Sequence, residues 1–229
     1  YGDAHGYARS RDVLDGSPNV DRSEVQRVYR EIVTPQNATI VLAGAVEPAI
    51  VEYVERAFGS WRAPATVSPT PIAAVSWKSG ARLVVVDRPG AVQSELAFGG
   101  LAPARSSPDA YTMIMIHELL GAHRTSRLTH ALVERDASSY AGATHLETRR
   151  GESAFYWDSS VPLAKTSAVL SEIDKELDDL GKNAPPAAEL DAWKARYVRQ
   201  LPLEMETARA NTALVSSIPI YKLGDDALD

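Results

Sequence analysis

The sequence predicts an α+β fold, in which a mixed or antiparallel sheet carries helices on one face. Two observations predict it. Beyond residue 80, pairs of strand patterns alternate with pairs of amphipathic helix patterns, an order typical of an α+β layer. The 229 residues are 45% hydrophobic and 24% charged, which is the composition of a globular protein and argues against disorder.

The composition also excludes several classes of function. Thirty acidic residues against 24 basic ones give a net charge of −6, which disfavours a nucleic-acid partner. The chain has no cysteine, so disulfides, thiolate zinc sites and cysteine nucleophiles are excluded. No apolar run approaches the roughly 18 residues that a membrane span needs, so no span is predicted.

The first 62 residues predict two helices that flank one strand. Asp21 and Glu24 have the spacing of a capping box, and an apolar face follows at Val25, Val28, Tyr29 and Ile32. The segment 38–44 is apolar on both faces and predicts a buried strand. A second helix begins at Pro48 and ends at Gly59.

Residues 63–80 contain three prolines among small residues and predict a linker between residues 1–62 and residues 81–229. A single strand cannot form a ladder by itself. We therefore expect the strand at 38–44 to complete a sheet whose other strands precede residue 1. We also expect the given sequence to be a piece cut from a longer chain at both ends.

The C-terminal part predicts four strands and five helices. The expected strands are 82–87, 92–98, 139–147 and 153–160. The expected helices run from Ser107 to Leu120, from Ser126 to Arg135, through 170–180, from Pro185 to a break at Pro202, and from 204 to 218.

Two histidines with a glutamate between them, His117-Glu118 and His123, are the candidates for a metal site. Zinc sites on one helix place two histidines four residues apart, as in H-E-x-x-H or H-x-x-E-H. A separation of six residues turns the two rings by about 240°. We therefore predict no metal site here, with one histidine half-buried and the other exposed. His5, His130 and His145 are interpreted as structural.

Other motifs carry little chemistry. The sequence has no G-x-S-x-G elbow and no phosphate-binding glycine loop. The acidic stretch 172–179 is interpreted as a solvated helix face. Tyr140, on a predicted strand, is either a donor to a developing oxyanion or a sheet aromatic, and spacing alone favours the second.

The order of short phrases resembles the pitrilysin/insulinase-type zinc metallopeptidases, the inverzincins. Tyr1–Arg9 resembles their Tyr-Gly…His-Pro-Tyr-Gly-Arg segment, with Gly6 in place of the proline. Three further segments resemble phrases of the family and come in the family's order: Asn37–Gly44, Asp87–Ser94, and Leu120-Gly121 with Ser126–Leu128.

The resemblance implies two similar α+β lobes in each half of the enzyme. In the family, the first lobe binds zinc through H-x-x-E-H and a later glutamate, and the second supplies an arginine and a tyrosine that hold the substrate. It implies that 1–62 is the tail of a first lobe, that 63–80 is a linker and that 81–229 is a second lobe, truncated at its C-terminus. Zinc ligands would then precede residue 1.

The resemblance places Tyr140 at the family tyrosine, as a catalytic candidate. The family arginine would stand seven residues earlier, where this chain has Val133, so Arg135 is the nearest substrate-binding candidate. The implied function is a fragment of a zinc metalloendopeptidase that hydrolyses peptides, inactive by itself. The alternatives are a non-catalytic structural or partner subunit of the same family and, third, a free-standing binding module.

The implied partners are a peptide or unfolded protein substrate and a second half-unit or subunit of the family. Arginine outnumbers lysine and alanine is abundant, as in GC-rich bacteria. Because bacterial relatives are often exported, the predicted location is the cell envelope or periplasm, and the alternative is the cytoplasm.

Overall fold

The computed structural model describes residues 1, 5–7, 20–62, 71–75, 80–224 and 226–227. The chain forms two compact units, which we call the helical unit (Tyr1–Ser76 with Pro202–Asp229) and the sheet unit (Trp77–Leu201). Most of the predicted linker 63–80 lies outside the described residues.

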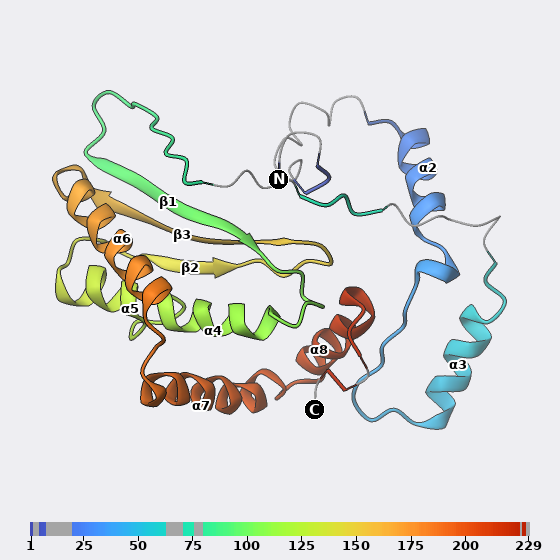
Figure 1. The fold of residues 1–229 in the computed structure, drawn as a ribbon. Coiled ribbons are helices and arrows are strands. Elements are labelled where there is room, and N and C mark those ends of the chain that lie inside the picture. The colour runs from blue at the N-terminus through green and yellow to red at the C-terminus, as the bar shows by residue number, and fades with distance from the viewer. Residues whose placement is uncertain (2–4, 8–19, 63–70, 76–79, 225, 228–229) are drawn as a thin grey trace. The chain divides into compact units, whose positions relative to one another are not determined.

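The helical unit contains α2 (Arg22–Ile32), η2 (Pro35–Asn37), α3 (Pro48–Phe58) and α8 (Ala208–Tyr221), visible in Figure 1. The predicted cap of α2 is confirmed, because the Asp21 carboxylate accepts a hydrogen bond from the Glu24 amide at 2.9 Å. The predicted ends of α3 at Pro48 and Gly59 are confirmed too. Local signals of this kind suffice to define a helix end.

His5 also lies in the helical unit and is buried. Its Nε2 donates to the carbonyl of Ala73 at 2.8 Å, and its Nδ1 accepts from the amide of Tyr7 at 3.1 Å. Its ring stacks on Tyr1. Both ring nitrogens are thus occupied, and the structural interpretation of His5 fits these contacts.

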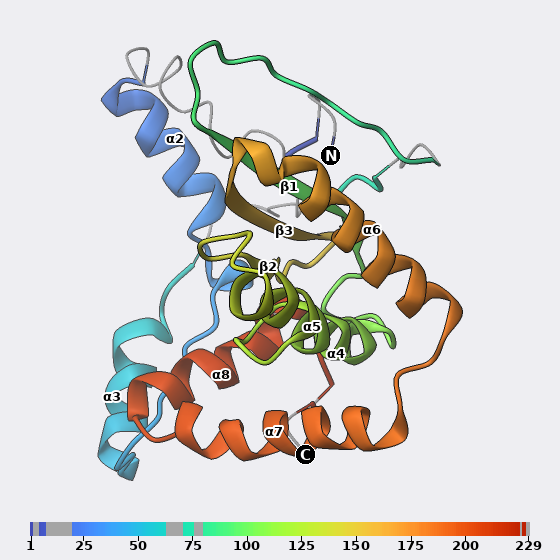
Figure 2. The same cartoon turned by 90° about the vertical axis from the view of Figure 1, so that its left-hand side faces the viewer.

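The sheet unit is built on three antiparallel strands, β1 (Gln93–Ala102), β2 (Ala143–Leu146) and β3 (Ser153–Pro162), in the order β1-β3-β2. Its helices are α4 (Ala110–Leu120), α5 (Arg127–Thr129), η3 (His130–Arg135), η4 (Leu163–Lys165), α6 (Thr166–Lys182) and α7 (Ala187–Glu204), of which the end from Pro202 on belongs to the helical unit. Figures 1 and 2 show α4, α5 and α6 beside the same side of the sheet. The predicted fold class is confirmed.

The core of the sheet unit lies between β3 and these helices. Burial alternates along β3, so that Phe155, Trp157 and Val161 face inward. They pack against apolar side chains of the helical layer, which are Leu119, Leu120, Leu128, Leu132, Val169 and Ile173. The alternate residues Tyr156, Asp158 and Ser160 face away, which leaves the other face of β3 free of buried side chains.

The predicted strand 82–87 is wrong, whereas the segment 38–44 forms no ladder within the described residues and its place in a larger sheet stays a prediction. Among the described residues, 38–43 and 81–88 adopt no helix or strand. Leu83, Val84, Val85 and Val86 are 64–85% exposed. A strand needs a neighbouring ladder to bond its backbone, and in the described structure neither segment has one. The sheet therefore has three strands rather than four.

Three helix predictions need correction at their ends. The helix predicted from Ser107 begins at Ala110 with Asp109 as its N-cap. The helix predicted to break at Pro202 continues to Glu204, with the proline in its last turn. The last helix starts at Ala208, after a Thr207 cap, rather than at 204.

Candidate functional site

Tyr140 follows a short segment that hydrogen bonds hold against two elements. The amides of Ser138 and Ser139 both donate to the carbonyl of Leu132, at 2.8 and 3.0 Å. The hydroxyl of Ser139 bonds that of Ser159 on β3. The Tyr140 amide donates to the carbonyl of Ser160 at 3.5 Å, yet the tyrosine side chain is 89% exposed. The backbone is thus anchored while the phenol stands in solvent.

The turn before Tyr140 has two unusual backbone features. Residues 130–135 form a π-helix, and the amide of Asp136 reaches back five residues to the carbonyl of Ala131. Ala137 then has a φ of 45°, in the left-handed region that non-glycine residues rarely adopt. The predicted helix over 126–135 is therefore only in part an α-helix. Such π-turns are frequent at functional sites.

Arg135 is hydrogen-bonded to two carboxylates. Its guanidinium donates to both carboxylate oxygens of Asp136, at 2.9 and 3.0 Å, and to Glu172 of α6 at 2.9 Å. These bonds raise the pKa of Arg135, and the bond from Arg135 lowers the pKa of Asp136. The structure therefore ties Arg135 to α6. No hydrogen bond among the described residues joins it to Tyr140.

The sheet face opposite the core carries a group of polar side chains from β1, β2 and β3. Ser160 donates to Glu95 at 2.7 Å. His145 Nε2 lies 2.8 Å from an Asp158 oxygen, and its ring stacks on Tyr156 at 4.7 Å. We call these five residues the polar sheet face. Sequence analysis missed them as a group, because the register that aligns β1, β2 and β3 is not visible in the sequence.

His117 and His123 bind different partners. His117 Nδ1 donates to the Thr144 hydroxyl at 2.8 Å, and that hydroxyl donates to the His117 carbonyl at 3.2 Å. His123 Nε2 lies 2.7 Å from the Glu118 carboxylate, and Arg196 donates to its Nδ1 at 3.0 Å. The prediction of one exposed histidine is wrong, because both rings are half-buried.

These residues do not fit a zinc ion. Both nitrogens of His123 are occupied by protein partners, and the Nδ1 of His117 is bound to Thr144. Within the described part of the chain no three histidine, aspartate or glutamate side chains are grouped as a metal site requires. No step of a reaction is therefore derived through a metal on these residues.

The burial of His117 has a measurable consequence. Burial lowers the pKa of His117, because a charged imidazole loses hydration there. The unfolded chain then binds more protons near the ordinary histidine pKa of about 6.5. We expect the free energy of unfolding to rise with pH through this range, so that it is lower in acid than at neutral pH.

Chemical denaturation between about pH 5 and 8 measures this slope. In His117→Gln the part of the slope that belongs to His117 should be missing. Identical slopes for the parent and the variant would contradict the prediction.

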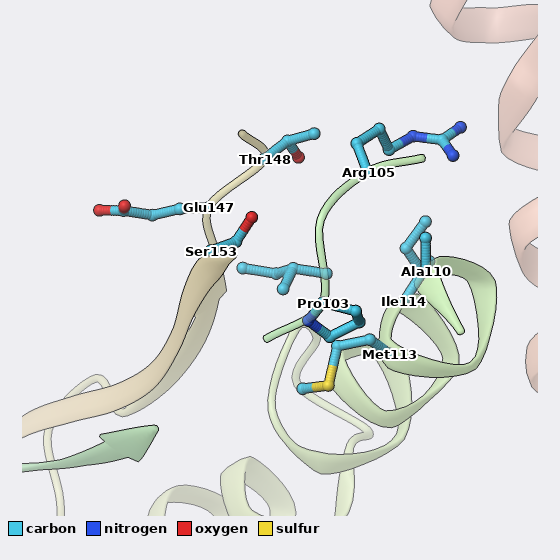
Figure 3. A pocket seen from close by; sticks show the side chains of 9 residues that line it. Pro103, Arg105, Ala110, Met113, Ile114, Glu147, Thr148 and Ser153 are labelled. Carbon is cyan, nitrogen blue, oxygen red and sulfur yellow. The ribbon is translucent and has the colours of Figure 1, made fainter. Parts of the chain in front are cut away.

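A small pocket lies where β1 ends, β2 ends and β3 begins. Its empty volume, open solvent included, is about 260 Å³, and Pro103, Met113 and Ile114 supply apolar walls. Figure 3 shows the Glu147 carboxylate and the Arg105 guanidinium pointing away from Pro103 and Met113. Ser153 is buried, and its hydroxyl accepts from the Arg149 amide at 3.2 Å. The two charged side chains of the lining therefore point away from its apolar walls.

Comparison with known proteins decides the family. The family described as peptidase M16 inactive domain matches residues 19–197. The chain belongs to this family. The predicted kinship with the pitrilysin/insulinase-type peptidases is thereby confirmed.

Relatives of this M16 chain come from several bacteria. It is 26% identical over 184 residues to "Zinc protease PqqE" of Helicobacter pylori, covering 79% of this chain and 41% of that protein. A crystal structure of a protease from Helicobacter pylori has a TM-score of 0.82 at 24% identity, over 91% of this chain and 51% of that one.

Two further solved structures share the fold. One is a peptidase M16 inactive domain from Pseudomonas fluorescens, with a TM-score of 0.68 at 18% identity over 92% of this chain and 50% of that one. The other is the periplasmic protease PqqL from Escherichia coli, with a TM-score of 0.57 at 14% identity over 78% of this chain and 20% of that one. The M16 chain thus spans 41–51% of the length of the first three of these proteins and 20% of the fourth.

Proposed function

We propose that residues 81–229 form the non-zinc lobe of the substrate chamber of a zinc metalloendopeptidase that hydrolyses peptides. In this proposal residues 1–62 are the end of the zinc-bearing lobe, and 63–80 link the two. The observation that carries the proposal is the match to the M16 inactive domain over residues 19–197. The Helicobacter pylori relative, named a zinc protease, supports it.

Exposed apolar surface in the helical unit supports the idea of a further lobe. Neither α2 nor α3 has a buried residue. Val25, Tyr29 and Ile32 lie on one face of α2 and are 55–61% exposed. Large apolar side chains in such a stripe usually pack against another element. A sheet that includes residues 38–44 would supply that element.

Tyr140 is the residue of this lobe proposed to contact the substrate. Its backbone is held by β3, while its phenol extends into solvent, which would leave it accessible to a peptide in the proposed chamber. A phenol placed in this way can donate to the oxygen on which charge develops during peptide hydrolysis. The chamber would supply the rest: zinc held by residues of the intact parent, and a peptide or unfolded segment as the substrate.

A second candidate function is a non-catalytic structural or partner subunit. It is favoured by Val133, which stands where the resemblance expects an arginine, and by Arg135, whose guanidinium is committed to Asp136 and Glu172. In either case we propose a second half-unit or subunit of the same family as the partner.

The proposed location is the bacterial cell envelope or periplasm, with the cytoplasm as the alternative. The structurally similar PqqL of Escherichia coli, a periplasmic protease, supports it. In the described residues no helix has the length and apolarity to span a bilayer.

The test is the substitution Tyr140→Phe in the intact zinc-loaded enzyme. We expect kcat/KM for a fluorogenic peptide to fall about 10-fold, the scale of one hydrogen bond made in the transition state. Circular dichroism at neutral pH should be unchanged, because the side chain is 89% exposed.

The matched control is Tyr53→Phe on α3, another exposed tyrosine, which should leave kcat/KM unchanged. An unaltered kcat/KM in Tyr140→Phe would contradict a contact between the Tyr140 hydroxyl and the substrate. No hydrolysis by the intact zinc-loaded protein would instead favour the non-catalytic subunit.

A further inference from the structure

Helix α7 attaches to the rest of the sheet unit through side chains on one of its faces. Glu189, Trp193 and Arg196 have the spacing i, i+4, i+7 and so share that face. Glu189 accepts from Arg127 at 2.6 Å. Trp193, the one buried residue of α7, stacks on the ring of His123 at 5.7 Å. His123 is therefore central to the docking of this helix.

The hydrogen bonds around His123 determine which form of the imidazole is present. Arginine has only donors, so the bond from Arg196 requires an unprotonated Nδ1 as its acceptor. The proton of the ring must then lie on Nε2, which donates to Glu118 at 2.7 Å. Only the neutral Nε2–H tautomer satisfies both contacts at once.

The charged groups that face this ring come from different elements. Glu118, which is 7% exposed, faces it from α4, and Arg196 faces it from α7, where the guanidinium also lies over Trp193 at 5.8 Å. His117 is a neighbour on α4. Arg127 of α5 is paired with carboxylates of α6 and α7, namely Glu176, Asp179 and Glu189. The hydroxyl of Ser126 accepts from the backbone amide of His123.

We propose that Arg196, His123 and Glu118 form a proton-sensitive latch, which holds the part of α7 around Arg196 docked when His123 is neutral and frees that part in acid. A proton added to Nδ1 turns an acceptor into a donor that faces the donors of Arg196. It also places two positive charges about 3 Å apart. Glu118 keeps its bond to the ring in both states, since a charged imidazole binds a carboxylate more strongly.

The direction with pH follows from the chemistry of imidazole. Histidine is the side-chain type whose charge changes between about pH 5 and pH 8. The latch is therefore closed at the alkaline end of this range and open at the acid end. Opening removes the bond to Arg196, while the pair Arg127–Glu189 still holds the start of α7. This device is independent of the proposed peptidase function.

Pulsed electron paramagnetic resonance between two spin labels tests the latch. The chain has no cysteine, so Thr112→Cys on α4 and Lys194→Cys on α7 place one label on each helix. Both positions are exposed. We expect one narrow distance distribution at about pH 8, and a broader, longer one at about pH 5.

Two variants in the doubly labelled protein isolate His123. In Arg196→Gln the uncharged amide can donate to a bare Nδ1 or accept from a protonated one, so α7 should stay docked at both pH values. In His123→Asn the side-chain oxygen offers Arg196 an acceptor that does not titrate, and the acid response should again be lost. Arg199→Gln, an exposed arginine on the same helix, should respond as the parent does.

Equal distance distributions at both pH values in the parent would overturn the latch. Persistence of the acid response in both Arg196→Gln and His123→Asn would overturn it as well, because another group would then be the sensor. Loss of the response in either variant, with the parental distance retained at about pH 8, would support it.

Discussion

Replacing Trp157 with alanine is expected to lower the free energy of unfolding of the sheet unit by about 3–5 kcal/mol. Trp157 is fully buried at the centre of the core and stacks on Phe98 at 5.7 Å. Its Nε1 finds no hydrogen-bond partner among the described residues, so the loss is one of packing. Urea denaturation followed by circular dichroism measures it.

The neighbouring position provides the matched control for Trp157. Tyr156 lies on the same strand but on the polar sheet face, where its ring stacks on His145. Tyr156→Ala removes a ring of similar size from a half-exposed site, so it should cost clearly less than Trp157→Ala. Equal losses would show that the core does not lie on the Trp157 face.

Arg127→Met is expected to cost about 2 kcal/mol at low ionic strength, the scale of a hydrogen bond to a charged group. Arg127 donates to Glu189 at 2.6 and 2.9 Å and to Asp179 at 3.1 Å, and it lies 4.0 Å from Glu176. Its loss leaves three carboxylates facing one another across α6 and α7. Denaturant titration of both proteins measures the difference.

The pH dependence of this loss has a definite sign. The hydrogen bond from Arg127 lowers the pKa of Glu189, so the bond stabilises the fold above the ordinary glutamate pKa of about 4.3. The stabilisation is lost as the pH falls through the lowered value. The difference between the parent and Arg127→Met should therefore shrink in acid.

Arg56→Met is the matched control. Arg56 pairs with Glu52 at 3.7 Å on the surface of α3, where both side chains are about two-thirds exposed. Exposed pairs of this kind contribute less than about 1 kcal/mol. If Arg56→Met lost as much stability as Arg127→Met, then burial and the number of bonds would not determine how strongly Arg127 stabilises the fold.

Helix ends could be read from the sequence where the signal lies within one turn. The Asp21 cap of α2 and the Pro48 and Gly59 ends of α3 are such signals. The region 126–135 could not be read in this way. Its apolar spacing fits an α-helix, and the change to a π-helix appears only in the bond from Asp136 to Ala131.

Strands were less predictable because their partners are remote. Residues 93–102 and 153–162 pair across some sixty residues, and that pairing makes β1 and β3 strands. Residues 82–87 have an equally strong strand composition but remain unpaired and exposed in the described structure. Composition favours an extended backbone, whereas only a neighbouring ladder turns it into a sheet.

In the candidate site too, local features could be predicted from the sequence, whereas contacts between distant residues could not. The six-residue spacing indicated that His117 and His123 would point apart, and the resemblance directed attention to Tyr140. Their contacts could not be foreseen, because Thr144 and Arg196 lie 27 and 73 residues further along the chain. The tie between Arg135 and Glu172, 37 residues away, was hidden for the same reason.

The sequence by itself determined the family, the α+β class and the cap of α2 and both ends of α3, since caps, periodicity and short phrases act within a few residues. Only the tertiary structure decided which strands pair, which arginine is committed to a carboxylate and which nitrogen of His123 carries the proton. Those properties depend on hydrogen-bond partners that folding brings together from distant parts of the chain.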